Sequence, residues 1–185
     1  MAQEITTAWS AGGAFADLWL KPGEQNSMYK SANGPSLELL KAFRSGLANV
    51  RDLKLLPAVG MKRLRPDGPF APKARAPFDL SELSVATFVA NLEGLLDMYD
   101  KGGFRAALAT DDANMATMVA DEVAGAIKLM REAMAHGAKA FTEPDHIARL
   151  AGARVPMAVA FRLGGDALER TIAGEVLGFV DSDGD

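Results

Sequence analysis

His136 and His146 are the side chains of this 185-residue chain best suited to bind a metal or to transfer protons near neutral pH. A helical metallopeptidase site places two histidines and a glutamate on one helix face, in the pattern H-E-x-x-H. His136 is followed by Gly137-Ala138-Lys139 and His146 by Ile147-Ala148-Arg149, so neither histidine belongs to that pattern. Each histidine is therefore predicted to be a surface or helix-end residue and not a metal ligand.

A second group of possible ligand atoms lies at the C-terminal end of the sequence. Asp181, Asp183 and Asp185 alternate with Ser182 and Gly184, and oxygen-rich clusters of this kind suit hard cations. An EF-hand loop also needs a glutamate at its twelfth position and a following helix, whereas the sequence stops at Asp185. Calcium binding of the EF-hand type is therefore not expected.

Other reaction chemistries lack a recognisable arrangement of residues. No G-x-S-x-G segment places a nucleophilic serine, and the absence of cysteine excludes disulfides, cysteine-ligated zinc and thiol catalysis. The net charge of −4 does not favour nucleic-acid binding. The sequence shows neither a signal peptide nor a stretch long and apolar enough to span a membrane.

The element that organises the chain is an amphipathic helix predicted over residues 84–99. Its apolar positions recur with the helical period and form one continuous face: Val85, Phe88, Val89, Leu92, Leu95, Leu96 and Tyr99. Ser81 and Ser84 are candidate N-caps, Asp79 and Glu82 have the spacing of a capping box, and Gly102-Gly103 marks the end. Asn91 and Glu93 flank the apolar face on opposite sides.

Further helices are predicted over residues 4–20, from Asn33-Gly34-Pro35 to about Pro57, over 104–108, from Asp111-Asp112 to Ala140, and after Pro156. Residues 57–78 contain five prolines and are predicted to be one long basic loop, either a solvated connection or a functional segment. The tryptophans and methionines are interpreted as core residues. The expected fold is all-α, an antiparallel bundle of four to five helices in a single domain over residues 1–185.

Two parts of the sequence resemble the imelysin family, bacterial envelope proteins first named for an insulin-cleaving metallopeptidase. Ala76-Pro77-Phe78 through Ser84, then Ala90-Asn91-Leu92-Glu93-Gly94-Leu95, Tyr99 and Gly102-Gly103, resemble the family's proline-containing loop and its asparagine-leucine-glutamate helix. The ending from Leu177 to Asp185 is similar to the family's Leu-Gly, Gly-Phe-Asn and Asp-Gly-Asp pattern, with Val180 in place of the asparagine. The resemblance is to the C-terminal half of a full-length member.

The resemblance implies a helical domain that meets a missing N-terminal half. That half carries the family's Gly-x-His-x-x-Glu motif, to which neither histidine here belongs, and iron or zinc would enter through it. The residues that match family motifs at the junction are Asn91, Phe179, Asp181, Asp183 and Asp185. Phe179 is expected to dock the tail, while Asp181 and Asp183 face the other half; a solvated acidic end is the alternative.

Two functional classes follow from the resemblance, and a third follows from the fold alone. The first is a periplasmic or outer-membrane-associated binding protein linked to iron or haem acquisition, with iron, haem or an envelope protein as its partner. The second is part of a metal-dependent peptidase, for which this chain lacks a visible metal ligand set and general base. The third is a helical interaction module without a ligand. We favour the first and expect no peptidase activity from this chain alone.

Overall fold

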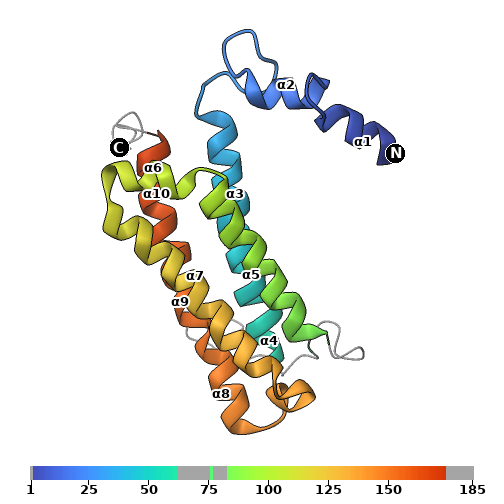
Figure 1. Cartoon of the computed structure of the whole chain (residues 1–185), viewed down its shortest axis with the longest axis vertical. Coiled ribbons are helices and arrows are strands. Elements are labelled where there is room, and N and C mark those ends of the chain that lie inside the picture. Colours follow the sequence, from blue (N-terminus) through green and yellow to red (C-terminus); the bar gives the residue numbers. More distant parts are fainter. Residues whose placement is uncertain (1, 62–75, 77–82, 174–185) are drawn as a thin grey trace, which may run out of the picture.

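A computed structural model of the chain describes residues 2–61, 76 and 83–173. All regular elements within these residues are helical, so the predicted all-α fold class is confirmed (Figure 1). They are α1 (Ala2–Trp9), α2 (Ala14–Leu20), α3 (Gly34–Ala48), η1 (Asn49–Leu55), α4 (Leu56–Ala58), α5 (Ser84–Lys101), α6 (Phe104–Asp111), α7 (Ala113–Met134), η3 (Gly137–Phe141), α8 (Pro144–Gly152), α9 (Arg154–Val159), η4 (Ala160–Gly164) and α10 (Gly165–Ala173).

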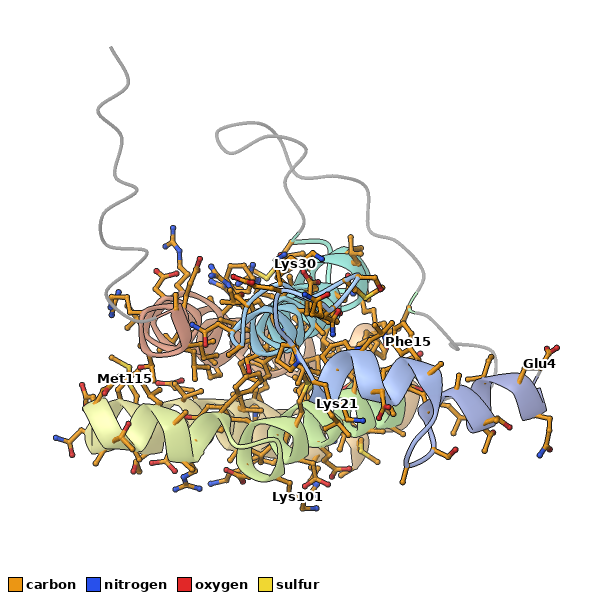
Figure 2. The ribbon with its side chains drawn as sticks, turned by 90° about the horizontal axis from the view of Figure 1, so that it is seen from above. Glu4, Phe15, Lys21, Lys30, Lys101 and Met115 are labelled. Atoms are coloured by element: carbon orange, nitrogen blue, oxygen red, sulfur yellow. The ribbon has the colours of Figure 1, made fainter. Side chains whose placement is uncertain are left out.

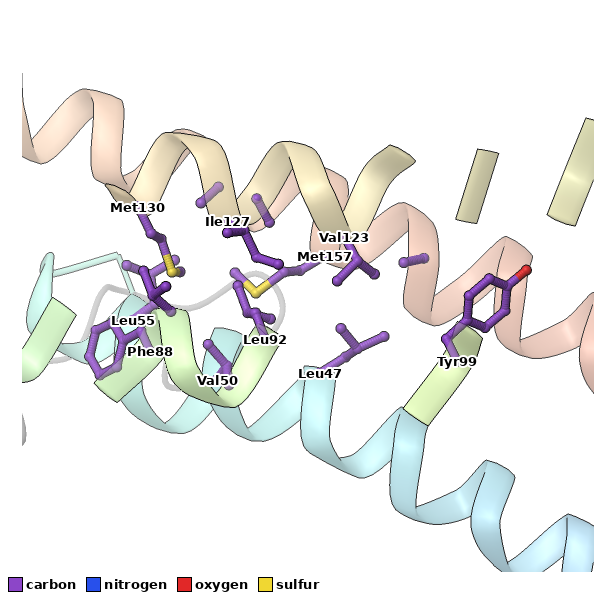
Figure 3. Packing of buried hydrophobic residues seen from close by; sticks show 14 of the residues in the cluster. Leu47, Val50, Leu55, Phe88, Leu92, Tyr99, Val123, Ile127, Met130 and Met157 are labelled. Carbon is purple, nitrogen blue, oxygen red and sulfur yellow. The ribbon is translucent and has the colours of Figure 1, made fainter. Parts of the chain in front are cut away.

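The long helices alternate in direction along the molecule. In Figure 1, α3 and α7 run downward, whereas α5 and the run from α8 to α10 run upward. Contacts join α3 to α5, α5 to α7, α7 to α9, and α10 back to α3, which closes a ring of packed helices. The core lies inside this ring, and Figure 3 shows part of its buried hydrophobic cluster.

Helix α5 has the predicted apolar face but a different start. Val85, Phe88, Val89, Leu92 and Tyr99 are buried, while Leu95 and Leu96 pack partly buried against the core. The predicted N-cap Ser84 is instead the first helical residue and is buried, with Leu83 as the N-cap and no side-chain capping bond. The other capping candidates, Asp79, Ser81 and Glu82, lie outside the described residues. At the other end Gly103 has φ +88°, a left-handed conformation that favours glycine.

The predicted helix over residues 4–20 is two helices, because the glycine pair interrupts it. Gly12 has φ +78°, and a Cβ atom on Gly13 would collide with the carbonyls of Thr7 and Ala8. Figures 1 and 2 show α1 and α2 projecting beyond the rest of the molecule. The prediction that both tryptophans are core residues is therefore wrong: Trp9 is 54% exposed, and Trp19 is only partly buried and lies outside the core cluster.

The predicted helix from Asp111-Asp112 to Ala140 is also shorter than expected. Asp112 caps α7 by accepting a hydrogen bond from the backbone N–H of Met115 at 2.9 Å. The helix then ends at Met134, and Gly137, with φ +53°, turns the chain into the 3₁₀ segment η3. Met134, predicted to lie on the core face, is 43% exposed because it occupies this helix end.

The segments η1 and η4 are π-helical and continue the helices before them. The Leu56 N–H donates to the carbonyl of Arg51, five residues earlier, just before Pro57, which has no N–H to donate. The helix that was predicted to end or kink at Pro57 ends one residue later, at Ala58. In η4 the Gly165 N–H likewise reaches back five residues, to the carbonyl of Ala160.

Candidate functional site

Asn91 lies in an open groove between α5 and the continuous run of α3 and η1, which we call the Asn91 groove. Its volume is about 410 Å³, and it is lined by Gly46, Asn49, Val50, Leu53, Lys54, Asn91, Gly94 and Leu95. The Asn91 side-chain N–H donates to the carbonyl of Thr87 one turn earlier, so the amide is fixed against its own helix. The structure thus places one predicted site residue in a groove formed by two helices.

Helices α3 and α5 approach each other closely beside the Asn91 groove. A Cβ atom on Gly46 would come within 2.5 Å of Leu95 Cδ2, so a larger residue there would require the Leu95 side chain to shift. Leu53, on the rim, is 61% exposed. With Asn49 and Lys54 beside it, the groove combines apolar surface with hydrogen-bond donors. The other predicted site residues, Phe179, Asp181, Asp183 and Asp185, lie outside the described residues.

The two histidines, which the sequence places ten residues apart in unrelated contexts, meet at the α7–α8 corner. Their rings stack with centroids 3.7 Å apart and an interplanar angle of 18°. His146 Nε2 lies 3.1 Å from Glu143 Oε2, while His146 Nδ1 is buried without a hydrogen-bond partner. The sequence predicts surface or helix-end positions for both histidines but not this contact, which depends on the turn at η3.

The metals implied by the imelysin resemblance, iron or zinc, do not fit the residues that the structure describes. Within residues 2–61, 76 and 83–173, no group of three or more histidine, cysteine, aspartate or glutamate side chains could hold a metal ion. In the stacked histidines the nitrogen lone pairs lie in nearly parallel planes, whereas zinc ligands converge on one atom about 2.0–2.1 Å away. The histidine pair is therefore not a metal centre.

A larger cavity lies where residues 28–34 meet α3, and we call it the Tyr29 cavity. It has a volume of about 870 Å³ and is lined by Met28, Tyr29, Gly34, Leu37, Glu38, Leu40, Lys41, Arg44, Ser45, Ala48, Phe161 and Glu169. Asn26 is only 8% exposed, and its side chain holds the chain that leads into the cavity. Its amide group donates hydrogen bonds to the carbonyls of Leu18 and Lys21. Its side-chain oxygen accepts hydrogen bonds from the backbone N–H groups of Met28 and Tyr29.

Charged side chains around the Tyr29 cavity are held in pairs. Arg44 donates to Glu169 at 2.9 Å and to Asp166 at 3.3 Å, which ties α3 to α10. The Arg44 side chain passes close to Gly165, where an added Cβ atom would come within 2.8 Å of Arg44 Nε. Lys41 donates to Glu38 at 2.7 Å, and this hydrogen bond raises the pKa of Lys41. The charged side chains around the cavity are therefore paired with one another.

Aromatic rings connect the Tyr29 cavity with the projecting helices. Trp19 lies between Trp9, at 6.0 Å between ring centroids, and Tyr29, at 5.3 Å. Phe15 packs edge-on against Trp9 at 4.6 Å. On the other side of the cavity the guanidinium groups of Arg44 and Arg51 both lie near the Phe161 ring, at 5.0 and 5.2 Å from its centroid. Sequence periodicity does not detect such contacts, because each joins residues of different elements and the contacts of Arg44 and Arg51 with Phe161 also join distant parts of the chain.

Comparison with known proteins adds no relative. The family models searched, the curated proteins and the solved structures contain no match to this chain. Among the helices that the structure describes, none has the length and apolar character needed to cross a bilayer. The imelysin resemblance and its functional implications therefore stay predictions.

Proposed function

We propose that this chain is an imelysin-like binding domain that meets a second helical unit at the Asn91 groove and contributes one wall of a site used in iron or haem acquisition. The observation that carries the proposal is the position of Asn91 in an open groove and not in the core. Asn91 is the one of the five predicted junction residues that the structure describes. The proposed location is the bacterial periplasm or the outer membrane, as the resemblance implies.

The residues that line the Asn91 groove are better suited to form one side of a shared site than to form a complete site by themselves. The Asn49 and Asn91 amides and the Lys54 ammonium supply hydrogen-bonding groups, and Leu53 supplies exposed apolar surface. Interface centres combine such anchors with polar groups that find partners on the opposing surface. Binding to an opposing surface is therefore the proposed role of the Asn91 groove.

The test mixes this chain with a separately purified imelysin N-terminal half that carries the Gly-x-His-x-x-Glu motif. Association is measured by calorimetry, and bound iron by elemental analysis of the separated complex. We expect a complex, and we expect Leu53→Asp to weaken it by at least about tenfold because a charge would be buried at the interface. Asn91→Ala should lower iron retention more than association.

Leu39→Asp is the matched control, since Leu39 is an exposed leucine of α3, at 38% exposure, that does not line the Asn91 groove. It should leave the complex unchanged. Equal weakening by Leu39→Asp and Leu53→Asp would refute the assignment of the groove as the contact. Failure of the two halves to associate at all would refute the proposed function.

A further inference from the structure

The Tyr29 cavity shares no lining residue with the Asn91 groove, so it is a separate candidate binding site. Its volume of about 870 Å³ falls within the usual range of small-molecule sites, about 300–1,000 Å³. Met28, Tyr29, Leu37, Leu40 and Phe161 make much of its lining apolar or aromatic. A cavity of this size and lining accommodates an apolar ring system with one polar group.

The charges around the cavity select the sign of that polar group. Two carboxylates, Glu38 and Glu169, and two cations, Lys41 and Arg44, line the cavity, and Asp166, which is not part of the lining, adds a third carboxylate through its ion pair with Arg44. A ligand carboxylate would have to displace one of these ion pairs. A ligand ammonium would instead be attracted by the surplus negative charge of this network. It could also donate a hydrogen bond, because an ionised carboxylate can accept about four hydrogen bonds and Glu169 and Asp166 each accept only one from Arg44.

The walls also suit a cation without any rearrangement of the ion pairs. The Tyr29 ring borders the cavity, and an ammonium group is attracted to the face of an aromatic ring. Tyr29 and Ser45 both line the same space, and their hydroxyl groups are of a kind that can accept hydrogen bonds from N–H donors. Because Asn26 fixes the backbone at Met28 and Tyr29, the wall they form is preorganised.

We propose that the Tyr29 cavity binds a small molecule with an aromatic or otherwise apolar body and a single ammonium group. The body lies against Tyr29, Leu37 and Leu40, and the ammonium points toward Glu169. This site does not depend on a second helical unit, so it can be tested on the isolated chain.

The test compares three probes that share a naphthalene body and differ in head group: 2-naphthylmethylamine, 2-naphthylmethanol and 2-naphthylacetate. Binding to the full chain is measured by calorimetry and by ligand-observed NMR at pH 7. The amine should bind about tenfold more tightly than the alcohol, as expected for one favourable charge contact near the surface, and the carboxylate should bind most weakly. The amine's advantage should shrink in high salt because exposed charges are screened.

Two variants locate the site. Ser45→Trp fills the cavity from an exposed position of α3 and should abolish binding of all probes, whereas Ala42→Trp, exposed on the same helix but outside the lining, should not. Glu169→Gln should lower affinity for the amine about three- to tenfold and leave the alcohol unchanged; Glu132→Gln is its control on α7. Circular dichroism verifies that each variant is folded.

Several results would overturn the proposal. They are the absence of amine binding at about 1 mM, the weak limit for a specific site, a preference for the carboxylate, or equal binding by the wild type and a folded Ser45→Trp variant. Amine binding that survives Ser45→Trp would show that the ligand sits elsewhere on the chain. None of these results bears on the contact proposed for the Asn91 groove.

Discussion

Replacing Leu92 with alanine removes three carbon atoms from the centre of the packed helices. Leu92 has 0% exposure, and Figure 3 shows it in the buried cluster together with Val50, Ile127 and Met157. Loss of hydrophobic burial at about 0.8 kcal/mol per carbon contributes about 2.4 kcal/mol. A residual cavity of about 30–100 Å³ adds about 0.7–2.4 kcal/mol. The expected loss in free energy of unfolding is therefore about 3–5 kcal/mol.

Guanidinium chloride unfolding, followed by circular dichroism at 222 nm, measures this loss. For a chain of 185 residues the same change should lower Tm by about 6–20 °C. The matched control is Leu53→Ala, since Leu53 is 61% exposed on the adjacent segment η1 and its truncation should cost less than about 0.5–1 kcal/mol. A Leu92→Ala loss below about 1 kcal/mol, or a loss equal to that of Leu53→Ala, would refute the reasoning about the core.

Three further predictions concern local features of the helices. Burial raises the pKa of Tyr99 to about 12, above the ordinary tyrosine value of about 10, so its contribution to stability is complete below pH 10 and is lost as the pH rises from 10 to 12. Tyr99→Phe removes the titrating hydroxyl and its 2.9 Å hydrogen bond to the Ala116 carbonyl. We expect the difference in free energy of unfolding between wild type and this variant to fall by about 2–3 kcal/mol over that pH range, measured by denaturant unfolding at each pH. A difference that stays constant with pH would contradict the assigned pKa. Asp112→Ala should cost about 0.5–2 kcal/mol by removing the N-cap of α7, measured as a shift in the urea midpoint, and an unchanged midpoint would show that the cap does not contribute. Gly103→Ala should destabilise by about 1 kcal/mol because φ is +88° there, whereas Gly94→Ala, a helix-interior site where an added Cβ meets no atom within 4 Å, should stabilise by up to about 1 kcal/mol; melting curves that show the same sign for both would refute this contrast.

The candidate sites were predictable from the sequence only in part. Asn91 was identified from a motif, and it does line a groove, but the groove also includes Gly46 and Leu95, which lie in close contact across two helices. Nothing near Asn91 in the sequence indicates that contact. The Tyr29 cavity was not predicted at all, since its Arg44, Phe161 and Glu169 come from α3, η4 and α10. A cavity lined by residues from distant segments cannot be predicted from the sequence pattern of any one segment.

Features that depend on neighbouring residues could be determined from the sequence by itself. The period of Val85, Phe88 and Leu92 predicts the buried face of α5, and Asn33-Gly34-Pro35 predicts the start of α3, because both depend on backbone geometry within a few turns. The all-α class follows from the same local signals repeated along the chain.

The tertiary structure alone decided which apolar and polar side chains meet. Trp9 is a large apolar residue of a type that is usually buried, but it is 54% exposed. The helix is interrupted at Gly12, and α1 projects away from the packed helices (Figure 1). His136 and His146 stack only because η3 folds α8 back toward α7. Burial and long-range contacts depend on how whole helices pack, and helical periodicity specifies a face without specifying the surface that covers it.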